Sequence, residues 1–125
     1  MRGMVESVVI MCEESPFGKN SVIESIRMAA GILAVGDVED VKVIILKDAV
    51  YFFDKNLNPE ALNVDKFTNV MRLIELSELE ILIHDEALKI AGLEVNDLSL
   101  KENLKIVNIQ EISQLILDAD MSFKY

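Results

Sequence analysis

Short apolar runs alternate along the chain with segments in which apolar residues recur every three or four positions. The short runs are rich in β-branched residues, which is typical of strands buried on both faces of a sheet. We expect strands over residues 7–12, 41–46, 79–83, 105–107 and 120–125. We expect helices from Ser21 to Gly36, through Phe67 to Ile74, from His84 to near Gly92, and from Asn108 through Ile116. This alternation predicts an α/β domain with a parallel sheet and helices on both of its faces.

The starts and ends of these helices carry local signals. Ser21 with Glu24, and Asn108 with Glu111, have the spacing at which two side chains cap a helix start reciprocally. Gly92 is a natural left-handed end for the helix after the third strand. Residues 54–64 are polar and form the longest stretch without a helix or strand pattern.

Length and composition narrow the possibilities. The 125 residues form a single domain, 1–125, and carry a net charge of −10, which argues against direct contact with nucleic acid. No apolar run approaches the roughly 20 residues of a membrane span, and Glu6 stands where a signal peptide would be apolar. One cysteine excludes an internal disulfide. We therefore expect a cytoplasmic protein without a membrane partner.

The junction between the third strand and its helix is the first place to look for a function. The carboxyl ends of parallel strands form the crevice in which α/β proteins place ligands and chemistry. The only histidine, His84, lies at this junction beside Asp85. Lys19 and Asp48 follow the first and second strands, so we expect a crevice lined by Lys19, Asp48, His84 and Asp85. A single histidine is a poor signal for a metal site, and we expect neither metal nor cofactor.

Three other candidates have two interpretations each. His84 is either a group that takes part in chemistry at the crevice or a capping or packing side chain. Cys12 either opens onto the crevice or is a small core residue, and Glu13 and Glu14 disfavour its thiolate. Tyr51, Phe52 and Phe53 form either a subunit interface or part of the core.

Four segments, in order, resemble the DsrE/DsrF-like sulfur-relay family, and most closely its TusC/DsrF branch. They are the turn at 14–21 (ESPFGKNS), the aromatic segment at 47–53 (KDAVYFF), the strand and helix at 82–93, and the closing segment at 117–125 (LDADMSFKY). Ala49 replaces the glycine that is usual in the second segment. The resemblance implies a three-layer α/β/α fold with a five-stranded parallel sheet.

The resemblance also implies a role. Proteins of this kind pass sulfur as a cysteine persulfide, towards 2-thiouridine in tRNA or in sulfur oxidation, and in carrier members the cysteine follows the third strand. That position is His84 here. We therefore expect a non-catalytic subunit that works with DsrE/TusD-like and DsrH/TusB-like partners. The alternatives are a self-assembling domain that binds a small anion or metabolite and, as the weakest, a sulfurtransferase that uses Cys12.

Overall fold

The computed structural model describes residues 6–16, 21–55, 64–99 and 102–125, with residues 64–68 described by their backbone alone. These residues form strands, α-helices (α) and short 3-10 helices (η). In chain order they are β1 (Ser7–Cys12), α1 (Ser21–Val35), β2 (Asp40–Ile45), η1 (Lys47–Phe53), α2 (Val64–Ser77), β3 (Glu80–His84), α3 (Asp85–Ile90), η3 (Val95–Asp97), β4 (Leu104–Val107), α4 (Ile109–Asp118) and β5 (Met121–Lys124).

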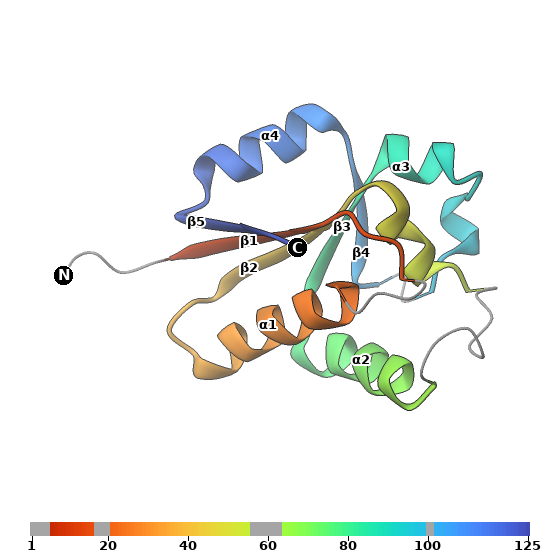
Figure 1. The fold of residues 1–125 in the computed structure, drawn as a ribbon. Coiled ribbons are helices and arrows are strands. Elements are labelled where there is room, and N and C mark those ends of the chain that lie inside the picture. Colours follow the sequence, from red (N-terminus) through yellow and green to blue (C-terminus); the bar gives the residue numbers. More distant parts are fainter. Residues whose placement is uncertain (1–5, 17–20, 56–63, 100–101) are drawn as a thin grey trace.

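The strands form one parallel sheet in the order β4-β3-β2-β1-β5, as Figure 1 shows. The strand β1, next to the edge strand β5, pairs with both β2 and β5, so that Ile10 lies between Val43 and Phe123. The predicted parallel sheet and its five strands are confirmed. Because all the strands run the same way, their carboxyl ends lie along one edge of the sheet.

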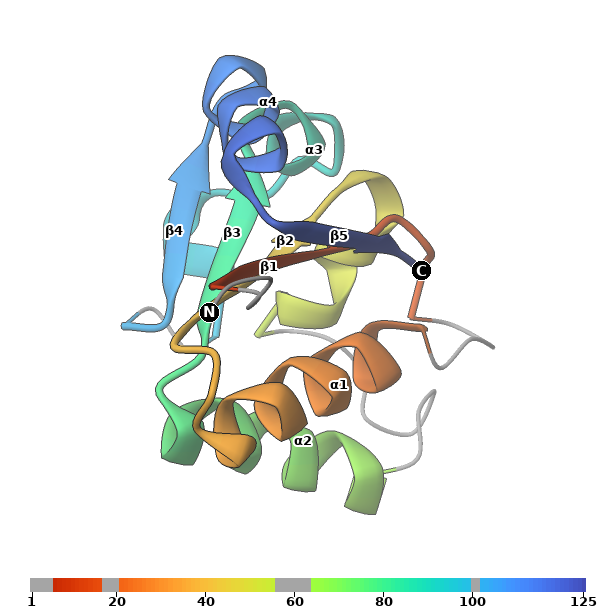
Figure 2. The same cartoon turned by 90° about the vertical axis from the view of Figure 1, so that its left-hand side faces the viewer.

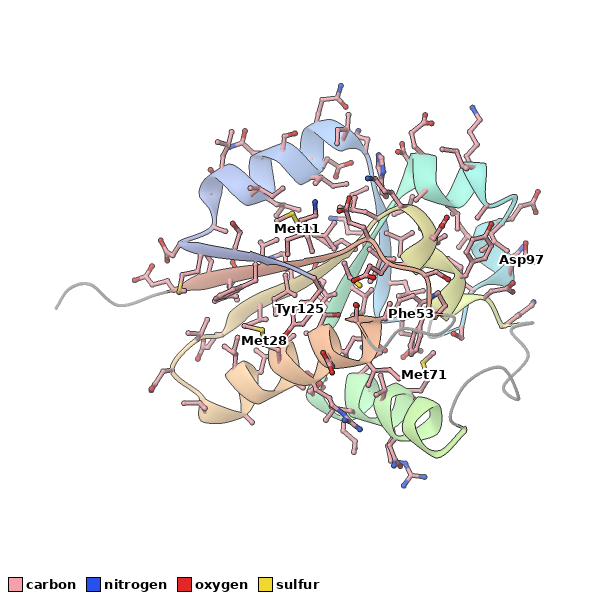
Figure 3. All side chains as sticks on the ribbon, viewed as in Figure 1. Met11, Met28, Phe53, Met71, Asp97 and Tyr125 are labelled. Atoms are coloured by element: carbon pink, nitrogen blue, oxygen red, sulfur yellow. The ribbon has the colours of Figure 1, made fainter. Side chains whose placement is uncertain are left out.

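Helices cover both faces of the sheet, which makes three layers (Figure 2). Side chains alternate along β1: Val8, Ile10 and Cys12 belong to the core beneath α1 and α2, whereas Val9 and Met11 face α4. Figure 3 shows Met11 on the α4 side of the sheet. Two helices therefore cover one face and α4 alone covers most of the other, while α3 packs at the carboxyl edge against η1.

Local signals at the helix ends agree with the structure in most cases. The amide of Glu111 donates to Asn108 Oδ1 at 2.9 Å, and the amide of Asn108 donates to Glu111 Oε1 at 3.2 Å, so the predicted capping box of α4 is confirmed. Gly92 has a φ of +73°, as expected of a left-handed helix end. Ser21 is instead the first residue of α1, and its hydroxyl donates to the carboxylate of Glu14 at 2.9 Å.

Candidate functional site

His84 is the last residue of β3, and α3 begins at the next residue. Its backbone is extended (φ −65°, ψ 126°) and it occupies the cap position of α3, which starts at Asp85. His84 pairs with Val107 across the sheet, so its side chain lies on the α4 side. Among the described residues its ring makes no cap hydrogen bond to α3. His84 therefore occupies the cap position without a side-chain cap bond, and its mostly buried side chain agrees with the packing half of the capping-or-packing interpretation.

One ring nitrogen of His84 is buried and lacks a hydrogen-bond partner among the described residues. The side chain as a whole is 18% exposed, whereas Nε2 is the buried nitrogen. The nearest acid atom is Asp85 Oδ1 at 3.6 Å, and that oxygen already accepts the amide hydrogen of Glu86 at 2.7 Å. A buried nitrogen without a partner costs free energy unless another group satisfies it. Nε2 of His84 is therefore an unsatisfied polar atom inside this edge of the described sheet.

Cys12 lies in the core, at the end of β1. Its side chain is fully buried beneath α1, and burial raises the pKa of its thiol. The negative charges of Glu14 and Glu13 raise that pKa further. The thiolate is the reactive form of cysteine, so this environment makes Cys12 a poor nucleophile.

A charge cluster that sequence reasoning missed ties three strands together at the same edge. Glu13 Oε1 lies 2.6 Å from Lys124 Nζ, and Glu13 Oε2 lies 3.1 Å from Lys47 Nζ. These contacts, with Lys124 first and Lys47 second, lower the pKa of Glu13. The cluster joins the segments after β1 and β2 to the end of β5. No local pattern predicts it, because its members are far apart in the sequence.

The aromatic segment of η1 is divided between the core and a cavity. Phe52 and Phe53 are fully buried and meet edge to face with ring centres 5.2 Å apart. These two rings belong to the core, so their interpretation as an interface is corrected. Tyr51 is half-buried and lines a cavity of about 250 Å³.

This cavity lies between η1 and α3. Its lining consists of Lys47, Asp48, Tyr51, Ala87, Ile90 and Ala91. The structure thus brings Asp48 and Tyr51 together, but His84, Asp85 and Cys12 do not line this cavity. Lys19, the other residue predicted for the crevice, lies outside the described residues.

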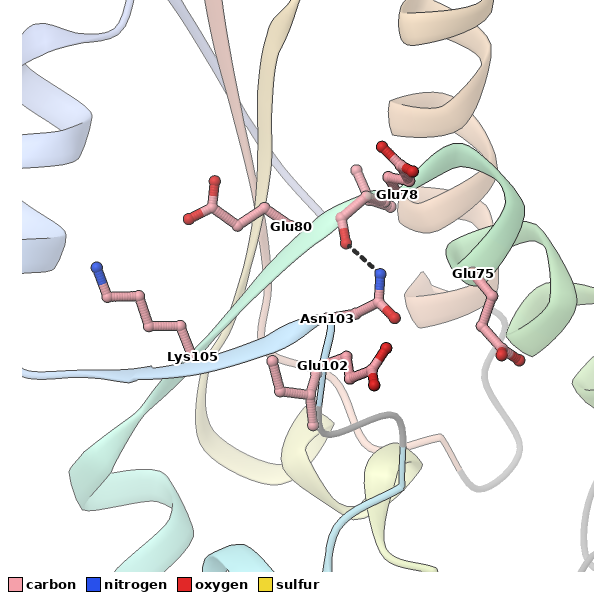
Figure 4. Close-up of a pocket in the computed structure, with 8 residues that line it drawn as sticks. Glu75, Glu78, Glu80, Glu102, Asn103 and Lys105 are labelled. Carbon is pink, nitrogen blue, oxygen red and sulfur yellow. Dashed lines mark hydrogen bonds between the residues drawn. The ribbon is translucent and has the colours of Figure 1, made fainter.

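A larger cavity of about 700 Å³ opens at the opposite end of the strands (Figure 4). Its walls carry Glu75, Glu78, Glu80 and Glu102 with Lys105, and the Asn103 side-chain amide donates to the carbonyl oxygen of Leu79 at 3.2 Å beside it. The glutamates are exposed, as expected of a solvated face. In the described part of the chain, no group of three or more His, Cys, Asp or Glu side chains has the arrangement of a metal site.

Comparison with known proteins decides the family. The family model of the DsrE/DsrF-like family matches residues 6–124. This chain belongs to the DsrE/DsrF-like family. Its fold is similar to that of the crystal structure of the ychN protein from E. coli, with a TM-score of 0.77, 20% identity, and coverage of 96% of this chain and 99% of that chain. The search of curated proteins found no match.

Two residues of chemical interest lie at the carboxyl ends of the strands in this chain. His84, the only histidine of the chain, is the last residue of β3 at this edge. The one thiol of this chain lies at the end of β1 and is buried. No helix within the described ranges is long and apolar enough to cross a membrane.

Proposed function

We propose that this protein is a non-catalytic, TusC/DsrF-like subunit of an intracellular sulfur-relay complex, in which a partner subunit carries the persulfide. One observation carries the proposal: in a chain of the DsrE/DsrF-like family, the only thiol is buried with a raised pKa. A carrier needs an accessible thiolate that can accept and release sulfur. The partners would be DsrE/TusD-like and DsrH/TusB-like subunits that serve tRNA 2-thiouridine formation or sulfur oxidation.

The carboxyl edge around His84 is the proposed contact surface for the carrier subunit. The His84 side chain is 18% exposed at this edge, so part of its ring could contact the carrier. Ile90, on the rim of the nearby η1–α3 cavity, is 82% exposed. Exposed apolar residues of this kind are found at the centres of protein interfaces.

Exposure to a small persulfide donor, followed by intact mass measurement, tests the absence of a carrier role. We expect the folded protein to gain no sulfur, and the Cys12→Ser variant to behave identically. The His84→Cys variant places a thiol where the family's carriers have theirs, and we expect it to gain one sulfur atom. A sulfur increment on the unmodified protein that Cys12→Ser abolishes would make this chain a carrier and overturn the proposal.

Co-purification with the organism's own DsrE-like and DsrH-like subunits tests the contact surface. We expect Ile90→Asp to weaken capture of the carrier subunit at least tenfold, because a charge would be buried against an apolar contact. Val35→Asp is the matched control, since Val35 is 72% exposed at the far end of α1. Equal capture by both variants and the unmodified chain would remove the carboxyl edge from the interface.

The cavity between η1 and α3 favours a second candidate function, the binding of a small anion or metabolite. Lys47 and Tyr51 are among the residues that line it, although Glu13 already pairs with Lys47. Inorganic phosphate and sulfate are the probes. A rise in melting temperature that saturates with phosphate and disappears in Lys47→Met would favour this function over the relay role.

A further inference from the structure

β4 is an edge strand of the sheet. The strand order places β3 on one side of Leu104–Val107, and no described strand lies on the other (Figure 2). The carbonyl oxygen of Asn103 accepts the Ile81 amide at 2.9 Å on the β3 side. Because successive residues of a strand turn their backbone groups to opposite sides, the N–H and C=O groups of Leu104 and Ile106 point outward. These outward groups, which we call the β4 edge, have no hydrogen-bond partner among the described residues.

One side of the β4 edge is acidic. Glu75, Glu78 and Glu102 line the cavity of about 700 Å³ on the α2 side of the strand, and all three are exposed (Figure 4). Lys105 is the one cation among the described residues that line this cavity. Its register partner Leu82 belongs to the cluster that packs against α4, so the Lys105 side chain lies on the α4 side. On the α2 side, the charges of the described lining residues are therefore all negative.

A free strand edge can accept one more strand. An extended segment satisfies the outward N–H and C=O groups with its own backbone, and its side chains alternate between the two sides of the sheet. We propose that the β4 edge binds an extended segment of a partner protein, which adds to the sheet as a strand and places lysine or arginine side chains on the α2 side. The backbone groups bind any extended chain, whereas the three glutamates select one with basic residues at alternate positions.

The same charges limit the occupant further. Phosphate groups would meet the negative charges of Glu75, Glu78 and Glu102, so nucleic acid is disfavoured. Lys105 disfavours a second row of basic residues on the α4 side, because like charges on neighbouring strands repel. The segment therefore carries basic residues on one side and uncharged or acidic residues on the other. Because the glutamates are exposed, water and salt screen their charges, and we expect a transient contact.

Fluorescence anisotropy with a labelled peptide of alternating lysine and valine, about eight residues long, tests the proposal. We expect saturable binding that weakens as salt is added, and no binding of the matching glutamate–valine peptide. Two further peptides carry N-methyl groups, one at the lysines and one at the valines. One of these two should bind about tenfold more weakly than the unmethylated peptide, because only one set of N–H groups faces β4. No saturable binding of the lysine peptide, or equal binding of all three lysine peptides, would overturn the proposal.

Two charge reversals in the protein locate the site. Glu102→Lys reverses one charge beside the β4 edge, and we expect it to weaken binding of the lysine peptide about fivefold. Glu24→Lys, an exposed position on α1, makes the same change of net charge and should bind the peptide like the unmodified chain. Equal affinities of the two variants would overturn the assignment to β4. The inference does not rest on the proposed relay role.

Discussion

Phe52 is a residue whose environment decides between a structural and an interfacial role. Its ring is buried and packs edge to face on Phe53, the last residue of η1. We expect Phe52→Ala to lower the free energy of unfolding by about 3–5 kcal/mol, because it leaves a cavity in the core. Urea denaturation measures the loss, with Phe52→Leu as a milder variant. Tyr51→Ala is the control and should cost clearly less, because Tyr51 is half-buried.

A stability change below about 1 kcal/mol for Phe52→Ala, with a change in solution mass, would contradict the core assignment. The sequence alone left this question open, since three consecutive aromatic residues suit either environment. The path of η1 gives the three rings different environments, because it turns Phe52 and Phe53 into the core and leaves Tyr51 at the cavity. Cys12 was easier to place, because unpaired cysteine is among the most buried residue types.

At the scale of elements, local chemistry was predictable wherever both interacting groups lie in one turn. Asn108 and Glu111 are three residues apart, and their reciprocal hydrogen bonds follow from that spacing. The first strand is found at its predicted residues, 7–12, because its apolar run has clear polar boundaries. The third strand is one residue later than predicted and includes His84. That shift matters for function, because it makes His84 a sheet residue on the α4 side.

The capping box of α4 gives a prediction at this scale. Asn108→Ala removes the side-chain acceptor of the Glu111 amide, and we expect a loss of about 1 kcal/mol in the free energy of unfolding. Gln110→Ala, an exposed position in the same turn, is the control and should change stability by less than about 0.5 kcal/mol. Equal losses in chemical denaturation would show that the box contributes nothing specific.

At the scale of the whole molecule, the sequence predicted a parallel sheet between helices but could not predict which side chains meet at its carboxyl edge. Strand order brings β5 beside β1, and this places Lys124 next to Glu13. Tyr125 is the residue after Lys124, and its hydroxyl donates to Met28 Sδ of α1 at 3.3 Å (Figure 3). This contact joins the last described residue to α1. Such long-range contacts arise only from the assembled topology.

The Glu13 cluster predicts how stability depends on pH. Lys124 and Lys47 hold the pKa of Glu13 below its unfolded value, so its contribution is fully present above the unfolded pKa, about 4.3. The contribution is lost as pH falls through the lower pKa of the folded state. We expect Glu13→Gln to cost up to about 1 kcal/mol at pH 7, because Lys47 and Lys124 are exposed and water screens their charges.

Urea denaturation of Glu13→Gln and the unmodified chain, from pH 7 down to pH 3, measures this dependence. The two stabilities should converge as the pH falls, and 1 M salt should narrow the difference at pH 7. Glu39→Gln, an exposed glutamate before β2, is the control for loss of one negative charge from an acidic chain. A difference that persists unchanged at low pH would mean that Glu13 acts through packing. If the stability of Glu13→Gln converges with that of the unmodified chain at low pH and that of Glu39→Gln does not, charge pairing with Lys47 and Lys124 stabilises the end of β5 against β1.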